Sequence, residues 1–236
     1  MSKKKVIIIG PAYPYRGGIA NFNNSLAKAF KKSGNEVEVI SFKLQYPSFL
    51  FPGKTQYESS DPPEDIIITD LINSVNPLNW VSVAKTINKK KPDYVIIRYW
   101  LPFMAPCLGT IARLLQKKIK ILAITDNIIP HEKRFGDFYL TKYFVSACDA
   151  FLTLSASVLD ELSQFTNSEK KKFVPHPIYD TFGKKLDKER AKKNLKLNFE
   201  DNYLLFFGFV RKYKGLDLML QAMSDKRIKD LGVKLI

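Results

Sequence analysis

The chain has 236 residues, of which 45% are hydrophobic and 13% aromatic, with 38 Lys and Arg against 23 Asp and Glu. This apolar fraction supports a packed core and excludes a disordered chain. Two cysteines exclude a small disulfide scaffold, and the apolar runs are too short for a membrane-spanning helix. We expect a soluble, cytoplasmic protein whose net charge of +15 favours acidic partners.

The N-terminal segment follows a strand–helix–strand pattern. Residues 6–9 are a continuous β-branched run, which is typical of a strand buried on both faces. Apolar residues then recur at helical spacing over 19–30, Gly34 ends that helix, and 36–42 alternates as a second strand. The two strands should therefore be parallel, with a right-handed crossover.

The same alternation continues along most of the chain. The pattern predicts helices over 77–90, 102–118, 137–147 and 155–165, and strands over 94–97, 119–124, 150–154 and 173–174. Residues 46–63 fit no period and indicate a long loop with an apolar middle at Phe49, Leu50 and Phe51. Residues 65–74 fit either a strand or a helix.

A second, shorter αβ pattern follows a polar linker. Residues 180–193 are polar and predict a linker with a short helix, and 203–209 form a strongly apolar strand. A helix over 216–223 follows, and 233–236 starts another buried-strand pattern. We expect a chain cut short within this second unit, with a complete edge strand as the alternative.

The loop from Gly10 to Gly18 is the first candidate binding segment, because open parallel sheets bind ligands beyond the carboxyl ends of their strands. Gly17 and Gly18 allow backbone N–H groups to approach an anion at a helix N-terminus, and Arg16 is placed to help. A simple tight turn explains the two glycines equally well. The spacing of the glycines in this loop is not that of the dinucleotide-binding fingerprint. Residues 53–55 imitate the end of a P-loop but lack the strand and helix that frame one, which excludes an ATPase.

Asp126 and His131 follow the strand predicted over 119–124. Both belong to one strand-to-loop end, so we expect them at the same sheet edge as Gly17. A carboxylate or imidazole there is suited to accept a proton from a substrate hydroxyl or to orient it. The alternatives are an Asx turn for Asp126 and a backbone-bonded loop histidine for His131. The His and Cys residues lack metal-ligand spacing, so we expect no metal site.

The segment 206–215 carries a second candidate site. A buried strand delivers Arg211 and Lys214 to a turn that opens a helix. Two cations oppose the dipole at a helix N-terminus, and a bound pyrophosphate would account for them. Exposed loop cations are the alternative.

Three stretches together resemble the family 4 glycosyltransferases of the GT-B fold. Residues 10–20 are similar to the family's glycine-rich first loop, and 125–132 to the loop that carries a catalytic-site residue in many members. Residues 207–217 are similar to the stretch that opens the second domain, and are the most specific of the three. The resemblance implies an α/β fold: a Rossmann-like parallel sheet with helices on both faces over 1–178, and an incomplete second Rossmann-like domain over 179–236.

The resemblance also implies a reaction and its partners. A hexosyltransferase-type enzyme would move a sugar, with retention of anomeric configuration, from a nucleotide-sugar donor to a glycan or lipid-linked acceptor. Synthesis of cell-surface polysaccharide is the expected setting. No cofactor and no metal are implied, because the main task is to stabilise the leaving diphosphate.

The resemblance assigns roles residue by residue. Asp126 stands where many members place a histidine, so Asp126 and His131 are both candidates for catalysis. The family's pair that binds the donor diphosphate matches Arg211 and Lys214. The family's loop that lines the cleft matches Arg16, Gly17 and Gly18.

The sequence departs from the family pattern at its C-terminal end. It stops before the paired-glutamate motif that recognises sugar and ribose, so we expect a truncated or split enzyme. The alternative is a non-catalytic, basic membrane-docking module, since apolar anchors such as 49–51 plus lysines bind anionic bilayers. Peripheral association with the inner face of a membrane is compatible with either. Specific nucleic-acid binding is not expected, because no recognition motif is present.

Overall fold

The computed structural model describes residues 2–47, 57–58, 63–130, 134–178, 183–208 and 210–236. The chain divides into two compact units, unit 1 (residues 1–176) and unit 2 (residues 177–236). The apolar triplet at 49–51, the P-loop imitation at 53–55 and the candidate His131 lie outside the described residues.

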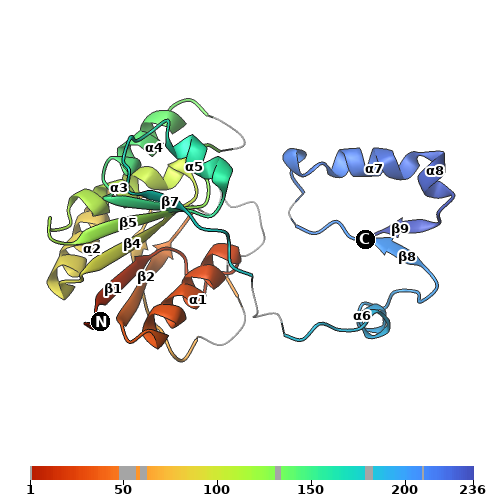
Figure 1. The fold of residues 1–236 in the computed structure, drawn as a ribbon, viewed down its shortest axis with the longest axis horizontal. Helices are drawn as coiled ribbons and strands as arrows, with labels where there is room; N and C mark the ends of the chain where they lie inside the picture. Colours follow the sequence, from red (N-terminus) through yellow and green to blue (C-terminus); the bar gives the residue numbers. More distant parts are fainter. Residues whose placement is uncertain (1, 48–56, 59–62, 131–133, 179–182, 209) are drawn as a thin grey trace. The chain divides into compact units, whose positions relative to one another are not determined.

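Unit 1 contains a seven-stranded parallel sheet with the order β3-β2-β1-β4-β5-β6-β7 (Figure 1). Its strands are β1 (Lys5–Ile9), β2 (Glu36–Leu44), β3 (Ile67–Asn73), β4 (Tyr94–Tyr99), β5 (Lys120–Thr125), β6 (Ala150–Thr153) and β7 (Lys171–Phe173). The central strands are mostly apolar because both of their faces are covered. The predicted parallel α/β sheet is confirmed, and residues 65–74, which fitted a strand or a helix, contain strand β3.

Helices cover both faces of this sheet (Figure 1). They are α1 (Gly18–Lys32), α2 (Pro77–Lys90), α3 (Ala105–Arg113) with the preceding short helix η2 (Pro102–Met104), α4 (Asp137–Val145) and α5 (Ala156–Leu162). Phe22 of α1 packs with Val6 and Ile8 on one face, whereas α2 to α5 contribute to the larger cluster on the other. Among the described residues, no helix has the length and apolar character to cross a bilayer.

The strand order reverses between β1 and β4, which lie side by side at the centre of the sheet. The chain leaves β1 toward β2 on one side and leaves β4 toward β5 on the other. The loops that follow these two strands therefore diverge at the carboxyl edge, the position where open parallel sheets bind their ligands. The topology places the predicted loop at 10–18 and the residue after β5, Asp126, at this edge.

The helix predicted over 102–118 was too long. It ends at Arg113, because the side chain of Asn88 in α2 takes over the backbone groups beyond that point. Asn88 Nδ2 donates to the carbonyl of Leu114 at 2.9 Å, and its Oδ1 accepts from the Gln116 N–H at 2.9 Å. A side chain from another helix thus ends α3, which no periodicity within the segment 102–118 could indicate.

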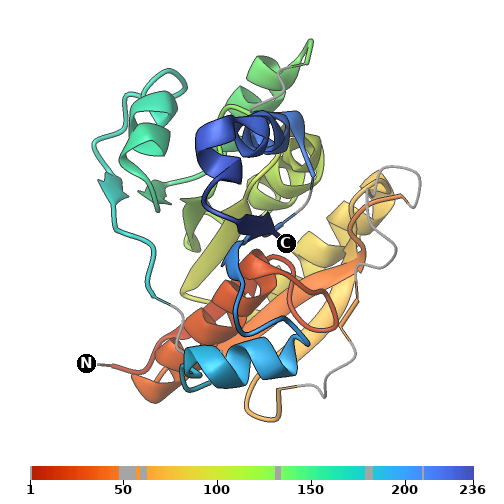
Figure 2. The same cartoon turned by 90° about the vertical axis from the view of Figure 1, so that its right-hand side faces the viewer.

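Unit 2 contains the parallel strands β8 (Asn202–Leu204) and β9 (Val233–Leu235) with three α-helices (Figures 1 and 2). In both views α7 (Leu216–Ser224) and α8 (Lys226–Lys229) lie on one side of the strand pair, and α6 (Lys188–Asn194) on the other. The strand predicted over 203–209 was too long. Strand β8 ends at Leu204, the Phe206 N–H still donates to the Ile236 carbonyl at 2.8 Å, and Phe207 is 88% exposed.

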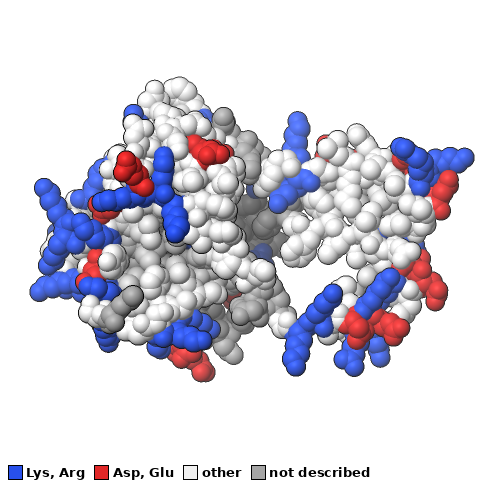
Figure 3. Space-filling view, viewed as in Figure 1, with Lys and Arg blue, Asp and Glu red and all other residues white. Residues whose placement is uncertain are grey.

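The positive charge of unit 1 gathers where its helices end. Helix α1 closes with Lys31 and Lys32, and α2 closes with Lys89 and Lys90. These cations complement the negative ends of the helix dipoles. In Figure 3 the Lys and Arg side chains of this face concentrate at the left, at the amino edge of the sheet. Many of the cations on this face of unit 1 thus lie at its amino edge.

Candidate functional site at the carboxyl edge of unit 1

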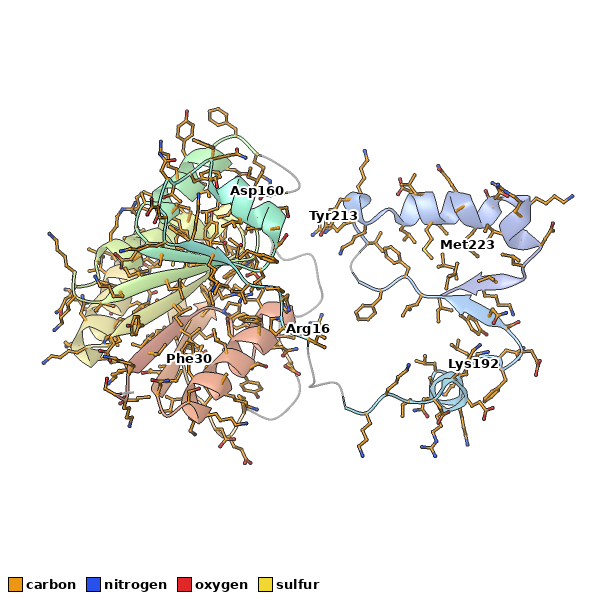
Figure 4. The ribbon with its side chains drawn as sticks, viewed as in Figure 1. Arg16, Phe30, Asp160, Lys192, Tyr213 and Met223 are labelled. Atoms are coloured by element: carbon orange, nitrogen blue, oxygen red, sulfur yellow. The ribbon has the colours of Figure 1, made fainter. Side chains whose placement is uncertain are left out.

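The loop between β1 and α1 is fixed by backbone hydrogen bonds. The Ala12 N–H donates to Ser41 Oγ at 3.1 Å, and the Tyr15 N–H donates to the Ala12 carbonyl at 2.8 Å. Gly17 caps α1 with φ of +119°, a backbone conformation that favours glycine. Arg16 is exposed beside the N-terminal end of α1 (Figure 4). The predicted loop residues therefore begin the helix at the sheet edge.

Gly10 packs where no side chain fits. A Cβ atom at this position would lie 2.5 Å from Asn23 Nδ2 and 3.0 Å from Arg98 Cβ. Asn23 of α1 is fully buried, and its Nδ2 donates to the carbonyl of Pro11 at 2.9 Å. Gly10 is therefore needed so that α1 and β4 can approach the end of β1.

Arg98 is the central residue of this edge, and the sequence analysis did not single it out. Its side chain is 1% exposed, and its Nε donates to Asp126 Oδ2 at 3.0 Å while a terminal nitrogen contacts Asp126 Oδ1. The guanidinium lies over the ring of Phe22, 4.1 Å from its centroid. The signal was present as one charged residue inside an otherwise apolar strand, since a buried charge requires a partner.

Asp126 is largely buried, with 19% of its side chain exposed. Burial raises the pKa of its carboxyl, while the charge and hydrogen bonds of Arg98, and the nearby His176, lower that pKa. Burial is the largest of these effects, so the pKa of this carboxyl lies above its ordinary value. The forked contact with Arg98 orients the Asp126 carboxyl group, whose oxygens can accept a hydrogen bond from a hydroxyl.

Five separate segments meet in this cluster. The His176 ring, at the end of unit 1, packs against the Phe22 ring with centroids 5.4 Å apart. We call the group formed by Gly10, Phe22, Arg98, Asp126 and His176 the Arg98 cluster. It joins the ends of β1, β4 and β5 to the first turns of α1, so a displacement of any one segment affects the others.

The second predicted site, Arg211 and Lys214, belongs to unit 2. Arg211 caps the short helix η3 (Lys212–Lys214), and the Lys214 N–H donates to the Arg211 carbonyl at 2.9 Å. Gly215, with φ of +70°, turns the chain into α7. The two exposed cations thus lie in one turn that opens a helix. Among the described residues, no three His, Cys, Asp or Glu side chains gather as a metal site would require.

Comparisons with known proteins add the family context. The model of Glycosyltransferase Family 4 matches residues 16–181. No curated protein sequence matches the chain significantly.

Solved structures share the fold at low sequence identity. The catalytic domain of starch synthase IV from Arabidopsis thaliana, bound to ADP and acarbose, gives a TM-score of 0.66 at 14% identity, covering 99% of this chain and 68% of its own. Sucrose-phosphate synthase from Thermosynechococcus elongatus gives 0.68 at 14%, with coverages of 99% and 70%. An alpha-glucosyltransferase in complex with UDP and DNA gives 0.61 at 15%, and the chain spans only 57% of that structure.

Proposed function

Because the chain belongs to glycosyltransferase family 4, we propose that it serves the transfer of a sugar from a nucleotide-sugar donor to a glycan or lipid-linked acceptor. The proposal rests on one observation above all. The family match covers most of the unit in which the buried Arg98 holds a carboxyl group at the carboxyl edge of a parallel sheet, one strand from its topological switch point. We further propose a hexosyl transfer with retention, in the synthesis of cell-surface polysaccharide by a cytoplasmic enzyme.

Asp126 has a specific part in this proposal. Held in place by Arg98, its carboxyl group accepts a hydrogen bond from a sugar hydroxyl and so orients the sugar at the edge of unit 1. Two of its lone-pair positions are used by Arg98, and the exposed fraction of the side chain leaves room for a further donor. His131 is the other candidate for catalysis, and Arg16, Gly17 and Gly18 would line the acceptor side.

Arg211 and Lys214 would bind the diphosphate of the donor. In a retaining transfer the bond from the sugar to the diphosphate breaks, and negative charge develops on the leaving oxygen. A forked guanidinium contact and a point charge from lysine stabilise this charge. The starch synthase and alpha-glucosyltransferase structures contain ADP and UDP, respectively, which supports a nucleoside diphosphate as the donor's leaving group.

The test uses the full-length protein with a complete second domain and a panel of UDP-, ADP- and GDP-sugars. Transfer is measured both to soluble glycans and to lipids extracted from membranes. Asp126→Asn alone would leave Arg98 buried without a counter-charge, so the informative variant is Arg98→Met/Asp126→Asn, which removes both charges. We expect one donor to support transfer and the double variant to be folded but inactive. Absence of binding and of transfer with every donor would contradict the proposal.

A further inference from the structure

The outer face of α4 is aromatic instead of polar. Its inner face packs in the core through Thr141, Phe144 and Val145. On the opposite face Phe138 is 46% and Tyr139 73% exposed, and Phe135 in the preceding turn is fully exposed. The outer face of a surface helix is normally charged or polar, so apolar residues on both faces indicate that this face contacts something other than water.

Two of these aromatic side chains pack into one group with Phe165. The rings of Phe138 and Tyr139 meet edge to face with centroids 5.8 Å apart, and Phe138 packs on Phe165 at 4.8 Å. Phe165 is partly buried against the core, so the inner part of the group is anchored. Phe135 and Tyr139 project furthest into solvent. We call Phe135, Phe138 and Tyr139 the α4 aromatic patch.

Cations flank this patch. Arg134 immediately precedes it, and Lys142 lies one turn further along the same helix face, three residues from Tyr139 and four from Phe138. The carboxylate on this helix, Asp137, accepts a hydrogen bond from the Arg134 backbone N–H at 2.7 Å in its own turn. Exposed aromatic rings bordered by Arg and Lys are suited to the headgroup region of an anionic bilayer.

A second copy of the chain fits this surface less well. Two-fold self-association would bring Arg134 and Lys142 of one copy toward the same cations of the other, and like charges at an interface oppose binding. An anionic lipid surface instead satisfies the rings and the cations together.

We propose that the α4 aromatic patch docks unit 1 on an anionic membrane surface. Helix α4 connects β5 to the parallel strand β6, so its N-terminal end, which carries the patch, lies at the carboxyl edge of the sheet. Asp126 lies at the same edge. This inference deepens the proposed function and rests on it. Of the two proposed acceptor classes, a soluble glycan and a lipid-linked acceptor, membrane docking favours the lipid-linked one.

The test is flotation of the full chain with vesicles of phosphatidylcholine and with vesicles containing equal parts of phosphatidylcholine and phosphatidylglycerol. We expect binding to the anionic vesicles only. Phe135→Ser/Tyr139→Ser should weaken binding about tenfold or more, since each inserted ring buries apolar area. Both side chains are exposed, so the variant should fold normally. The emission of Tyr139→Trp should also shift to the blue when anionic vesicles are added.

Two control variants test whether binding depends on this patch or on any exposed apolar side chain or any exposed positive charge. Ile67→Ser removes a side chain that is 66% exposed at the amino edge, at the start of β3. The double variant Lys89→Gln/Lys117→Gln removes two exposed charges near that amino edge. It is compared with Arg134→Gln/Lys142→Gln, which removes the two cations that flank the patch. We expect the controls to bind nearly as the unmodified chain does.

Several outcomes would overturn the proposal. Equal flotation of Phe135→Ser/Tyr139→Ser and the unmodified chain would do so, as would an equal loss in the Ile67→Ser control. Self-association in ultracentrifugation that the aromatic substitutions abolish would assign the patch to a second copy. The vesicle assay contains no donor and no acceptor, so its failure would leave the proposed sugar transfer standing, and failed transfer would leave membrane docking standing.

Discussion

The guanidinium of Arg98 contacts both carboxylate oxygens of Asp126. Arg98 lies within the β4–β5 ladder, and Asp126 lies one residue beyond its end. Tyr99 pairs with Thr125 at the end of the β4–β5 ladder, and the Asp126 N–H then donates to the Tyr99 carbonyl at 2.8 Å. Backbone and side chain therefore fix Asp126 together. The loop that continues toward α4 starts from a rigid point, as a site that must orient a substrate requires.

Replacing Arg98 should reveal how much free energy of unfolding is lost when Asp126 is buried without its partner. Arg98→Met leaves an uncompensated buried carboxylate, which destabilises the fold by roughly 3–5 kcal/mol at neutral pH. The folded-state pKa of Asp126 then rises further above its unfolded value. The penalty is full above that folded pKa and shrinks as the pH falls through it, because the protonated carboxyl is neutral. Urea unfolding at neutral and acidic pH measures this difference.

The double variant Arg98→Met/Asp126→Asn is the control for that prediction. It removes both charges and keeps the approximate volume of both side chains, so much of the lost stability should return and the pH dependence should disappear. A double variant as unstable as Arg98→Met would show that packing of the guanidinium on Phe22, not charge pairing, dominates.

A methyl group at Gly10 should disturb the same cluster from another side. Gly10→Ala places a Cβ against Asn23 Nδ2 and Arg98 Cβ, and we expect a loss of about 1–3 kcal/mol in unfolding free energy. In Gly10→Ala/Asn23→Ala the nearest collision is relieved, but the contact with β4 persists, so recovery should be partial. Thermal unfolding of the two variants and of the unmodified chain measures it, and an unchanged midpoint for Gly10→Ala would contradict the close packing.

Arg211 and Lys212 offer a matched pair in unit 2. Both are exposed cations in one turn, but only Arg211 is proposed to bind the donor diphosphate. Arg211→Ala should weaken binding of the donor that supports transfer by roughly tenfold to a hundredfold, the value of a hydrogen bond to a charged group. Lys212→Ala should have little effect. Calorimetric titration tests this, and equal effects of both substitutions would indicate only general attraction.

The two cysteines should be unreactive in the folded protein. Burial raises the pKa of the Cys107 thiol to about 12 and also raises the pKa of Cys148. Little thiolate forms at mildly alkaline pH, and the thiolate is the reactive species. Ellman's reagent should therefore detect almost no thiol in the native chain and both thiols in denaturant. Rapid labelling of the native chain would contradict this.

The hydrophobic pattern predicted the ends of a helix correctly where residues of that same segment determine them. Helix α2 begins and ends where the periodicity and Pro77 place it, and Asn76 caps it through hydrogen bonds to the backbone of Leu78 and Asn79. The predicted helix over 102–118 failed because Asn88, from another helix, ends α3. Strand β8 is shorter than the apolar run 203–209 and ends at Leu204.

The sequence by itself determined the alternation of strands and helices, the parallel sheet and the family, because hydrophobic periodicity and short motifs are properties of neighbouring residues. It also placed Asp126 at the end of a strand. Only the tertiary structure decided that Arg98 neutralises Asp126, that Gly10 must lack a side chain and that α4 turns aromatic rings outward. Those facts depend on which residues of distant segments meet, and packing in three dimensions settles that.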